Sequence, residues 1–453
     1  MQPLSAQEIT GDWNGALQVQ KMQIRIIFHI SKTETGYAGT MDSPDQGAKG
    51  IALSNVTFSG KQLTLQLLPL KIEYTGTMDS LGNINGNFAQ GGQSLPLVLS
   101  RATVEKVVMK RPQEPVKPYP YISEEVVFEN PKANITLAGT LTLPSAKGKF
   151  PTVVLVSGSG PQNRDEELMG HKPFLVLADY LTRNGIAVLR YDDRGTFASK
   201  GDFSKATSFD FATDAQAAVN FLKTHKNIDP GKIGIIGHSE GGLIAPLVAD
   251  SDKNVSFIVL LAGPGLQGSE ILMLQQQLIG RASGMEEKKI QQTAKINKAI
   301  FDLINRSDAN AALENDLKNL LMKTMEDNPE MEIPKGMTAN QLVEQQLTQI
   351  NTPWVLNFIR YNPAPALQKV KCPVLALIGE KDLQVPAKEN LPVIEAALKK
   401  GGNKNFMVKE LPGLNHLFQE CKTGAPAEYI DIEQTISPVA LETMANWIKQ
   451  TVK

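Results

Sequence analysis

The chain has 453 residues, of which 42% are hydrophobic and 21% are charged. This is the composition of a globular protein of about two to three domains, and it excludes a disordered chain, a collagen-like fibre and a coiled coil. The 46 basic and 47 acidic side chains leave a formal net charge of −1, which gives no electrostatic reason to expect nucleic acid or an anionic membrane as a partner.

The two cysteines and the apolar segments narrow the class further. Cys372 and Cys421 cannot form a disulfide framework or a multi-cysteine zinc site, although one disulfide between them stays open. No apolar run approaches the ~20 residues that span a bilayer, so we expect no transmembrane segment. The start, Met1–Ser5, is too polar for a signal peptide. We favour an exported, periplasmic protein whose leader has been removed over a cytoplasmic one, and the sequence does not separate the two.

Residues 1–104 are predicted to form a small all-β domain. Short apolar runs such as Met22–Ile30, Leu63–Leu68 and Leu95–Leu99 are separated by Gly, Asn and Asp. The segment Tyr37–Ser43 recurs almost unchanged as Tyr74–Ser80. Two copies are too few for a solenoid, so we expect one hairpin used twice in a barrel or a sandwich.

Residues 105–120 are predicted to form a proline-rich linker. Four prolines between Arg111 and Pro120 favour extended backbone and exclude a helix. The alternative is a strap that lies on the next domain.

Residues 121–453 are predicted to form a mainly parallel α/β domain. A strand pair at Glu124–Glu129 and Ile135–Leu143 comes first. Short, nearly continuous apolar runs follow, as expected of strands buried on both faces; they are Thr152–Val156, Ile186–Arg190, Lys232–Ile236, Phe257–Leu261, Pro373–Ile378 and Phe406–Leu411. Helical patterns lie between most of them. At about 265–368 the strands stop, and helical spacing alone predicts a helical insertion, which we expect to form a cap.

The segment Gly237–Gly241 reads G-x-S-x-G and stands between a predicted strand and a predicted helix. A serine at the tip of such a turn is a nucleophile elbow, whose flanking glycines leave room where a Cβ would collide. We therefore take Ser239 as the candidate nucleophile. The alternative is a glycine-rich turn without a catalytic role.

A serine hydroxyl needs a base, and His416 follows the last strand, where the histidine of this architecture is expected. The chain has only five histidines. Asp382, after the next-to-last strand, is our candidate for the acid that orients the imidazole, and Glu380 is its rival.

The tetrahedral oxyanion needs two backbone N–H donors. We assign one to Glu240, the residue after the nucleophile. For the other we choose Ser159, with Gly158 as the next candidate, in the glycine-rich loop after the Thr152–Val156 strand.

A substrate pocket is the least defined part of the site. Trp354, Phe358 and Tyr361 fall at i, i+4 and i+7 in the insertion. Such a stripe is usually core, but here it is also a candidate wall of the pocket, together with His238.

These motifs resemble the α/β-hydrolase superfamily. Ser157–Asp165, Tyr191–Gly195 and Gly237–Gly241 are similar to a branch of bacterial serine esterases related to the S33 aminopeptidase-like hydrolases, with a small β-domain before the catalytic one. The resemblance implies hydrolysis of carboxylic esters. It also implies that Arg164, Asp165, Asp193 and Arg194 brace loops rather than take part in catalysis. Ser157 departs from the pattern, because many relatives carry His there.

The functional hypothesis is thus a serine esterase for small to medium, fairly apolar acyl groups. No organic cofactor is implied, and the clustered ligands of a metal site are missing. We expect a small-molecule ester as the partner. Whether the chain also forms a homo-oligomer is left open by the sequence. The rival enzyme readings are a serine peptidase or aminopeptidase and a thioesterase. A rival of another class is a glycan- or partner-binding protein with a degenerate hydrolase domain.

Overall fold

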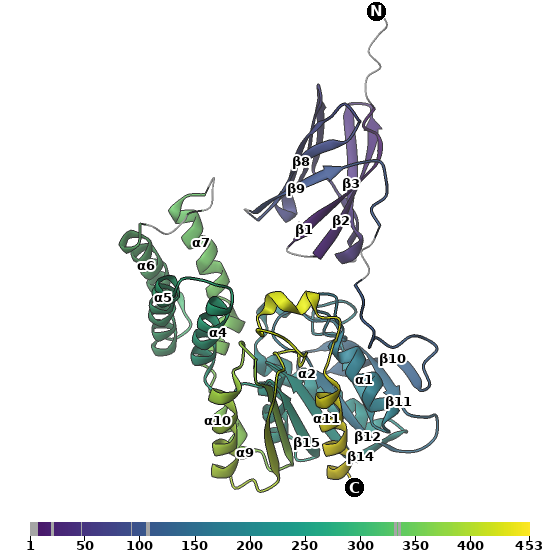
Figure 1. Cartoon of the computed structure of the whole chain (residues 1–453), viewed down its shortest axis with the longest axis vertical. Coiled ribbons are helices and arrows are strands. Elements are labelled where there is room, and N and C mark those ends of the chain that lie inside the picture. Colours follow the sequence, from purple (N-terminus) through teal and green to yellow (C-terminus); the bar gives the residue numbers. More distant parts are fainter. Residues whose placement is uncertain are drawn as a thin grey trace, which may run out of the picture. The chain divides into compact units, whose positions relative to one another are not determined.

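The structure is a computed structural model that describes residues 8–453 except 20–21, 47, 92, 106–108, 330–332 and 334–336. Two compact units make up the chain: an all-β unit that ends at Met109 and a larger unit that begins at Lys110 (Figure 1). In the part that is described, no helix combines the length and the apolar character needed to cross a bilayer.

The β-unit consists of two antiparallel sheets, of four and five strands, that enclose one hydrophobic core. The strands are β1 (Gly11–Val19), β2 (Met22–Thr33), β3 (Gly36–Ser43), β4 (Ala48–Ala52), β5 (Asn55–Ser59), β6 (Gln62–Leu67), β7 (Ile72–Met78), β8 (Ile84–Gln90) and β9 (Gln93–Leu99), with 3₁₀ turns η1 (Pro44–Gln46) and η2 (Leu68–Leu70). The backbone of Asn14 in β1 exchanges two hydrogen bonds with Ser100, directly after β9, so the two sheets are joined along one edge. The repeated segment places one copy in β3 and the other in β7 and the turn after it.

The larger unit is built on one eight-stranded sheet with the order β10-β11-β13-β12-β14-β15-β16-β17. The strands are β10 (Ile122–Asn130), β11 (Ile135–Leu143), β12 (Phe150–Val156), β13 (Ala187–Tyr191), β14 (Ile228–His238), β15 (Val255–Leu261), β16 (Val374–Gly379) and β17 (Phe406–Leu411). β10 and β11 are antiparallel to their neighbours, and the strands from β13 to β17 are parallel. This is the α/β-hydrolase fold that the sequence predicts, preceded by the predicted all-β unit, so the fold class is confirmed.

Helices cover both faces of this sheet because its strands alternate side chains between two cores. In β12, Val153 and Leu155 enter one core, and Val154 and Val156 enter the other. One core is closed by α1 (Pro173–Arg183) and α11 (Pro438–Thr451), and the other by α2 (Ser208–Thr224), α3 (Gly241–Ser251) and α10 (Ala387–Lys400). Two 3₁₀ turns, η3 (Phe203–Lys205) and η4 (Pro426–Asp431), complete the loops.

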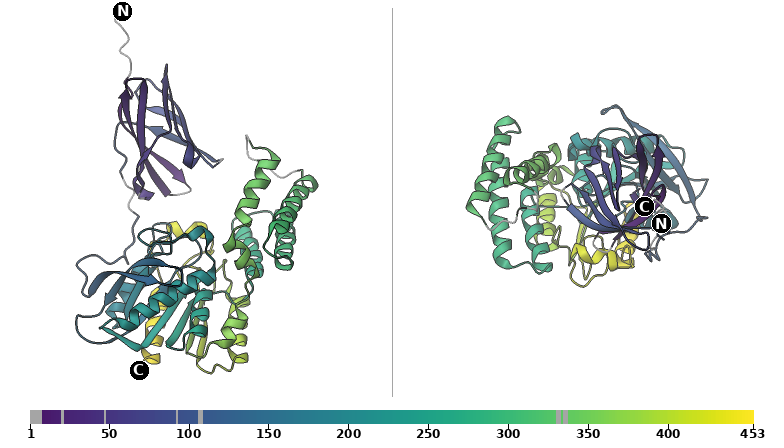
Figure 2. Two further views of the ribbon diagram at one scale, coloured as in Figure 1. Left: turned by 180° about the vertical axis from the view of Figure 1, so that it is seen from behind. Right: turned by 90° about the horizontal axis from the view of Figure 1, so that it is seen from above.

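Within the described residues, six helices lie between β15 and β16, in the stretch predicted as a helical insertion. They are α4 (Gly268–Ala282), α5 (Glu287–Arg306), α6 (Ala311–Asp327), α7 (Ala339–Ile350), α8 (Pro353–Arg360) and α9 (Ala364–Lys369). Ile300, Leu317 and Val343 lie in a core of the insertion's own. Helices α5 to α7 accordingly stand apart from the sheet, and α8 returns toward it and contacts α2 and η3 (Figure 2).

The proline-rich segment is bound to the larger unit at its start. The Arg111 guanidinium donates to the backbone carbonyls of Met169, Gly170, Ile430 and Ile432 at 3.0 to 3.2 Å. Gln113 accepts from the backbone N–H groups of Thr435 and Ile436 and donates to the carbonyl of Ile436. Contacts of this kind are those expected of the alternative to a free linker, a strap that lies on the next domain.

Candidate active site

Ser239 occupies a strained turn between β14 and α3. Its φ is +51°, in the left-handed region that costs a non-glycine residue about 1–3 kcal/mol. The Ser239 N–H donates to the Leu261 carbonyl at 2.8 Å, and the Gly242 N–H donates to the Ser239 carbonyl at 2.9 Å. These two bonds fix the turn on the neighbouring strand and on the first turn of the helix.

The glycines around Ser239 are required by close backbone contact. A Cβ on Gly237 would lie 1.9 Å from the carbonyl oxygen of Gly241, and a Cβ on Gly241 would lie 2.1 Å from that of Val156. Both distances are far below van der Waals contact. The elbow therefore has the geometry that the G-x-S-x-G pattern indicates.

His416 and Asp382 are brought together by the loops after β17 and β16. Nδ1 of His416 lies 2.8 Å from Oδ2 of Asp382, and the two residues are 4% and 2% exposed. The other carboxylate oxygen accepts the backbone N–H groups of Gln384 and Val385, both at 2.8 Å. The carboxylate is thus held on both sides and aims one oxygen at the imidazole. Glu380, the rival acid, instead accepts the N–H of Gly413.

The remaining histidines do not compete for this role. The pKa of His171 is lowered to about 4, chiefly by burial, and its ring nitrogens contact Thr435 and the carbonyl of Tyr429. His29 belongs to the β-unit, between Asp12 and Asp42. His225 lies 3.7 Å from Glu124, far along α2 from the elbow.

The glycine-rich loop after β12 reaches the elbow, but only one of the two predicted donors in it is unengaged. A Cβ on Gly158 would lie 3.3 Å from the Ser239 Cβ, so the loop passes beside Ser239. The Gly158 N–H donates to Oε1 of Glu166 at 2.7 Å, and the expectation that it serves as an oxyanion donor is therefore wrong. Within the described residues, the N–H groups of Ser159 and Glu240 have no acceptor.

Two buried carboxyl groups lie behind this loop. Burial, together with the charges of Glu240 and Glu166, raises the pKa of Asp193 to about 8, although the Gln162 N–H and the Ser157 hydroxyl both donate to it. Burial also raises the pKa of Glu240. Through its bonds to Ser157 and Gln162, Asp193 joins the loop after β12, which we call the oxyanion loop, to the loop after β13.

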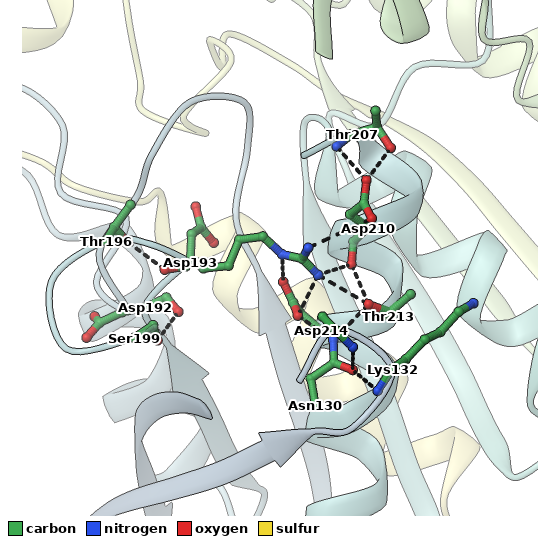
Figure 3. Close-up of polar contacts among 12 residues, drawn as sticks. Asn130, Lys132, Asp192, Asp193, Thr196, Ser199, Thr207, Asp210, Thr213 and Asp214 are labelled. Carbon is green, nitrogen blue, oxygen red and sulfur yellow. Dashed lines mark hydrogen bonds and ion pairs between the residues drawn. The ribbon is translucent and has the colours of Figure 1, made fainter. Parts of the chain in front are cut away.

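The loop after β13 is braced by ion pairs in the way that the family resemblance implies. Arg194 donates to both carboxylate oxygens of Asp214, at 2.6 and 2.9 Å, and to the carbonyl of Asp210 (Figure 3). Asn130 donates to the same carboxylate from the end of β10. Arg164 pairs with Asp192 in the same manner. These charges are satisfied within the scaffold, so they hold loops in place.

Of the aromatic stripe in the insertion, Trp354 contacts the elbow. Its indole N–H donates to Oε1 of Glu240 at 2.8 Å, and the Ser208 hydroxyl donates to the same oxygen. Phe358 is buried and stacks on Trp354 at 5.0 Å, and Tyr361 packs edge-on against Phe209. The structure thus gives Phe358 and Tyr361 the packing contacts of core residues, and Trp354 an anchoring contact.

His238 does not face a pocket with free polar atoms. Its ring is 7% exposed, with Nδ1 at 2.9 Å from Glu166 and Nε2 at 3.1 Å from the carbonyl oxygen of His416. His238 lines a small, otherwise apolar cavity, so its place in the wall of a substrate pocket stays a prediction, while both of its ring nitrogens already have partners within the protein. Glu166 itself was missed in the sequence, because it lies in an irregular loop at φ +51°. The signal in the sequence was His238 itself, because a histidine beside Ser239 on a buried strand needs a polar partner.

No resident metal site is evident in the described part of the chain, where no three His, Cys, Asp or Glu side chains gather as ligands. Cys372 and Cys421 are both free thiols.

The eight-stranded sheet with a serine elbow after β14 defines an α/β hydrolase. The family model described as "Serine aminopeptidase, S33" matches residues 172–420, more than half of the chain, and the chain belongs to this family. The resemblance stated from the motifs is thereby confirmed.

Individual relatives are more distant. Esterase EstD of Thermotoga maritima is 28% identical over 334 residues, which cover 72% of this chain and 69% of that protein. An uncharacterized 31.7 kDa protein of Escherichia coli is 24% identical over 57% of this chain and 82% of its own length. Among solved structures, the alpha/beta hydrolase GrgF from Penicillium is 17% identical, with a TM-score of 0.45 over 73% of this chain and 99% of its own. Est1E from Butyrivibrio proteoclasticus, solved with ferulic acid, is 17% identical, with a TM-score of 0.42 over 72% of this chain and 99% of its own.

Proposed function

We propose that this protein hydrolyses carboxylic esters of small to medium, fairly apolar acyl groups, with Ser239 as nucleophile, His416 as general base and Asp382 as the orienting acid. The observation that carries the proposal is the 2.8 Å contact between buried His416 and buried Asp382, at the same edge of the sheet as the strained Ser239 turn. A carboxylate on Nδ1 leaves Nε2 of the imidazole unprotonated and able to accept the serine proton.

The reaction proceeds in two halves. His416 takes the proton from Ser239 Oγ as the oxygen attacks the ester carbonyl, and the resulting oxyanion binds the N–H groups of Ser159 and Glu240. The imidazolium then donates its proton to the leaving alcohol, which departs from the acyl-enzyme. Water, deprotonated by the same imidazole, releases the acid and restores Ser239.

An ester is favoured over an amino-terminal peptide as the substrate, because the carboxyl groups near Ser239 are already engaged by the protein. An aminopeptidase needs a carboxylate that binds the substrate ammonium. Glu166, Asp193 and Glu240 are all buried or nearly so, and each already accepts hydrogen bonds from the protein. The Thermotoga maritima relative, which is named an esterase, supports the same choice. Because the family description names an aminopeptidase, peptide hydrolysis is the second candidate.

The test is a side-by-side assay of the purified chain on p-nitrophenyl acetate, an aminoacyl anilide and an acyl-CoA. We expect rapid ester hydrolysis, which Ser239→Ala abolishes. The matched control is Ser251→Ala, at the C-terminal end of α3, the helix that follows Ser239. We expect this variant to leave the rate unchanged. Faster cleavage of the anilide or the thioester would replace the ester proposal, and an unreactive wild type would refute a hydrolase altogether.

A further inference from the structure

The imidazole of His238 lies between two hydrogen-bond acceptors. Nε2 faces the backbone carbonyl of His416, which can only accept. Nδ1 faces Oε1 of Glu166, and that oxygen also accepts the Gly158 N–H at 2.7 Å. A neutral imidazole has one N–H, whereas an imidazolium has two. Two acceptors, one of them a carboxylate oxygen that already accepts a second bond, fit an imidazolium paired with a carboxylate.

The surroundings keep this pair out of water. His238 and Glu166 are 7% and 4% exposed, and the small cavity that they line has otherwise apolar walls, including Phe174 and Leu417. The second oxygen of Glu166, Oε2, is buried and has no partner among the described residues. The titratable groups that face His238 are Glu166, Asp382 and His416, whose ring centroid lies 4.9 Å away.

The pKa of His238 agrees with this geometry. Burial alone would lower it, but the Glu166 charge and hydrogen bond, the His416 carbonyl and the Asp382 charge raise it, and the pKa lies above its ordinary value.

Three loops that are distant in the sequence meet at this pair. Glu166 holds the oxyanion loop after β12 through Gly158, and His238 ends the strand that carries Ser239. Through the carbonyl of His416 the pair also holds the loop that carries the general base.

Resting on the proposed esterase function, we propose that Glu166 and His238 are positioning residues, whose ion pair holds the oxyanion loop and the His416 loop in catalytic alignment only while His238 carries both protons. Loss of a proton from His238 leaves a lone pair that faces either the His416 carbonyl or the Glu166 carboxylate, so one of the two bonds is replaced by repulsion. Activity then has an alkaline limit that belongs to His238.

The kinetic test follows kcat and KM against pH on an uncharged ester for the wild type, Glu166→Gln, His238→Gln and Glu167→Gln. As positioning residues, Glu166 and His238 act through the loops that they hold, so we expect kcat to fall about 10- to 100-fold in both variants, as for a small misplacement of catalytic groups, with KM nearly unchanged. In Glu166→Gln the alkaline limit moves to lower pH by about one to three units, because the opposite charge is gone. In His238→Gln that limit disappears. Glu167→Gln makes the same chemical change at an exposed neighbour and behaves as the wild type.

A second measurement needs no variant with altered packing around the pair. The imidazole ¹⁵N shifts of the wild-type protein report directly which nitrogens carry protons. We expect both nitrogens of His238 to be protonated at pH 7, and a neutral tautomer at that pH would overturn the proposal. An unchanged kcat and alkaline limit in folded Glu166→Gln would overturn it as well. If instead the wild type hydrolyses no ester, or Ser239→Ala stays active, the proposed function itself fails, and the two failures are distinguished.

Discussion

Replacing Asp382 by Asn tests the role of the acid while leaving the loop intact. An amide oxygen in the place of Oδ1 can still accept the Gln384 and Val385 N–H groups, so the turn after β16 keeps both of its 2.8 Å bonds. The amide NH₂ then faces Nδ1 of His416 at the position where the carboxylate oxygen lay at 2.8 Å. Because the NH₂ group donates, Nδ1 must accept, and the proton moves to Nε2. The base then presents an N–H to the serine.

The expected loss follows from this wrong tautomer. A triad with the acid replaced by its amide loses roughly 10⁴-fold in kcat, which corresponds to about 5 kcal/mol of transition-state stabilisation. The assay is the steady-state rate on p-nitrophenyl acetate, with thermal unfolding to establish that the variant is folded. Glu380→Gln is the matched control, since Glu380 bonds Gly413 rather than the histidine, and it should keep its rate within a few fold. A folded Asp382→Asn enzyme within tenfold of the wild-type rate would refute the reasoning.

Three further predictions concern stability. Gly237→Ala should lower the free energy of unfolding by more than about 3 kcal/mol or prevent folding, because the new Cβ would lie 1.9 Å from the Gly241 carbonyl oxygen, and an unshifted Tm would contradict this. Arg111→Ala should lower the free energy of unfolding by about 3 kcal/mol, because the backbone carbonyls that Arg111 binds lose their donor. The exposed Lys110→Ala should leave stability unchanged, and equal Tm values for the two variants would contradict the prediction. Native Asp193, with its pKa raised by burial to about 8 from 3.8, binds more protons than the unfolded chain between these values, so the contribution of Asp193 to stability should fall as pH rises from about 4 to 8. Relative to Asp193→Asn, the wild type should therefore lose stability over this range in urea unfolding at several pH values, and parallel pH dependences would contradict the assignment.

The central strands of the sheet could be predicted from the sequence because strands buried on both faces appear as short, nearly continuous apolar runs, and Ile135–Leu143 agrees with the structure to the residue. The edge strand Phe406–Leu411 also agrees to the residue, although one of its faces is exposed at Met407 and Lys409. β14 is longer than predicted: it begins at Ile228, which pairs with Phe150 of β12, and the Asp-Pro-Gly-Lys segment after it hides this start in the sequence. The elbow motif put its end at Ile236, two residues before the observed end at His238.

Asp382 and His416 could be predicted to meet because each follows a recognisable strand in the expected order, and their side chains are in contact at 2.8 Å. The N–H of Gly158 could not be judged, because its acceptor, Glu166, is eight residues away in a loop without periodicity. The strap was considered only as an alternative, because the partners of Arg111 are backbone carbonyls: two are near residue 170, at Met169 and Gly170, and two are more than 300 residues beyond Arg111, at Ile430 and Ile432. Pattern reasoning thus found the groups fixed by strand ends and missed those fixed by long-range hydrogen bonds.

The central claim is that Ser239 is a nucleophile activated by His416. The most direct measurement is to treat the folded protein with a fluorophosphonate and locate the adduct by peptide mass spectrometry. We expect one adduct, on Ser239, that forms at least a hundredfold more slowly in Asp382→Asn, because His416 then no longer acts as a base. An unlabelled wild-type protein, or an adduct on another serine, would contradict it.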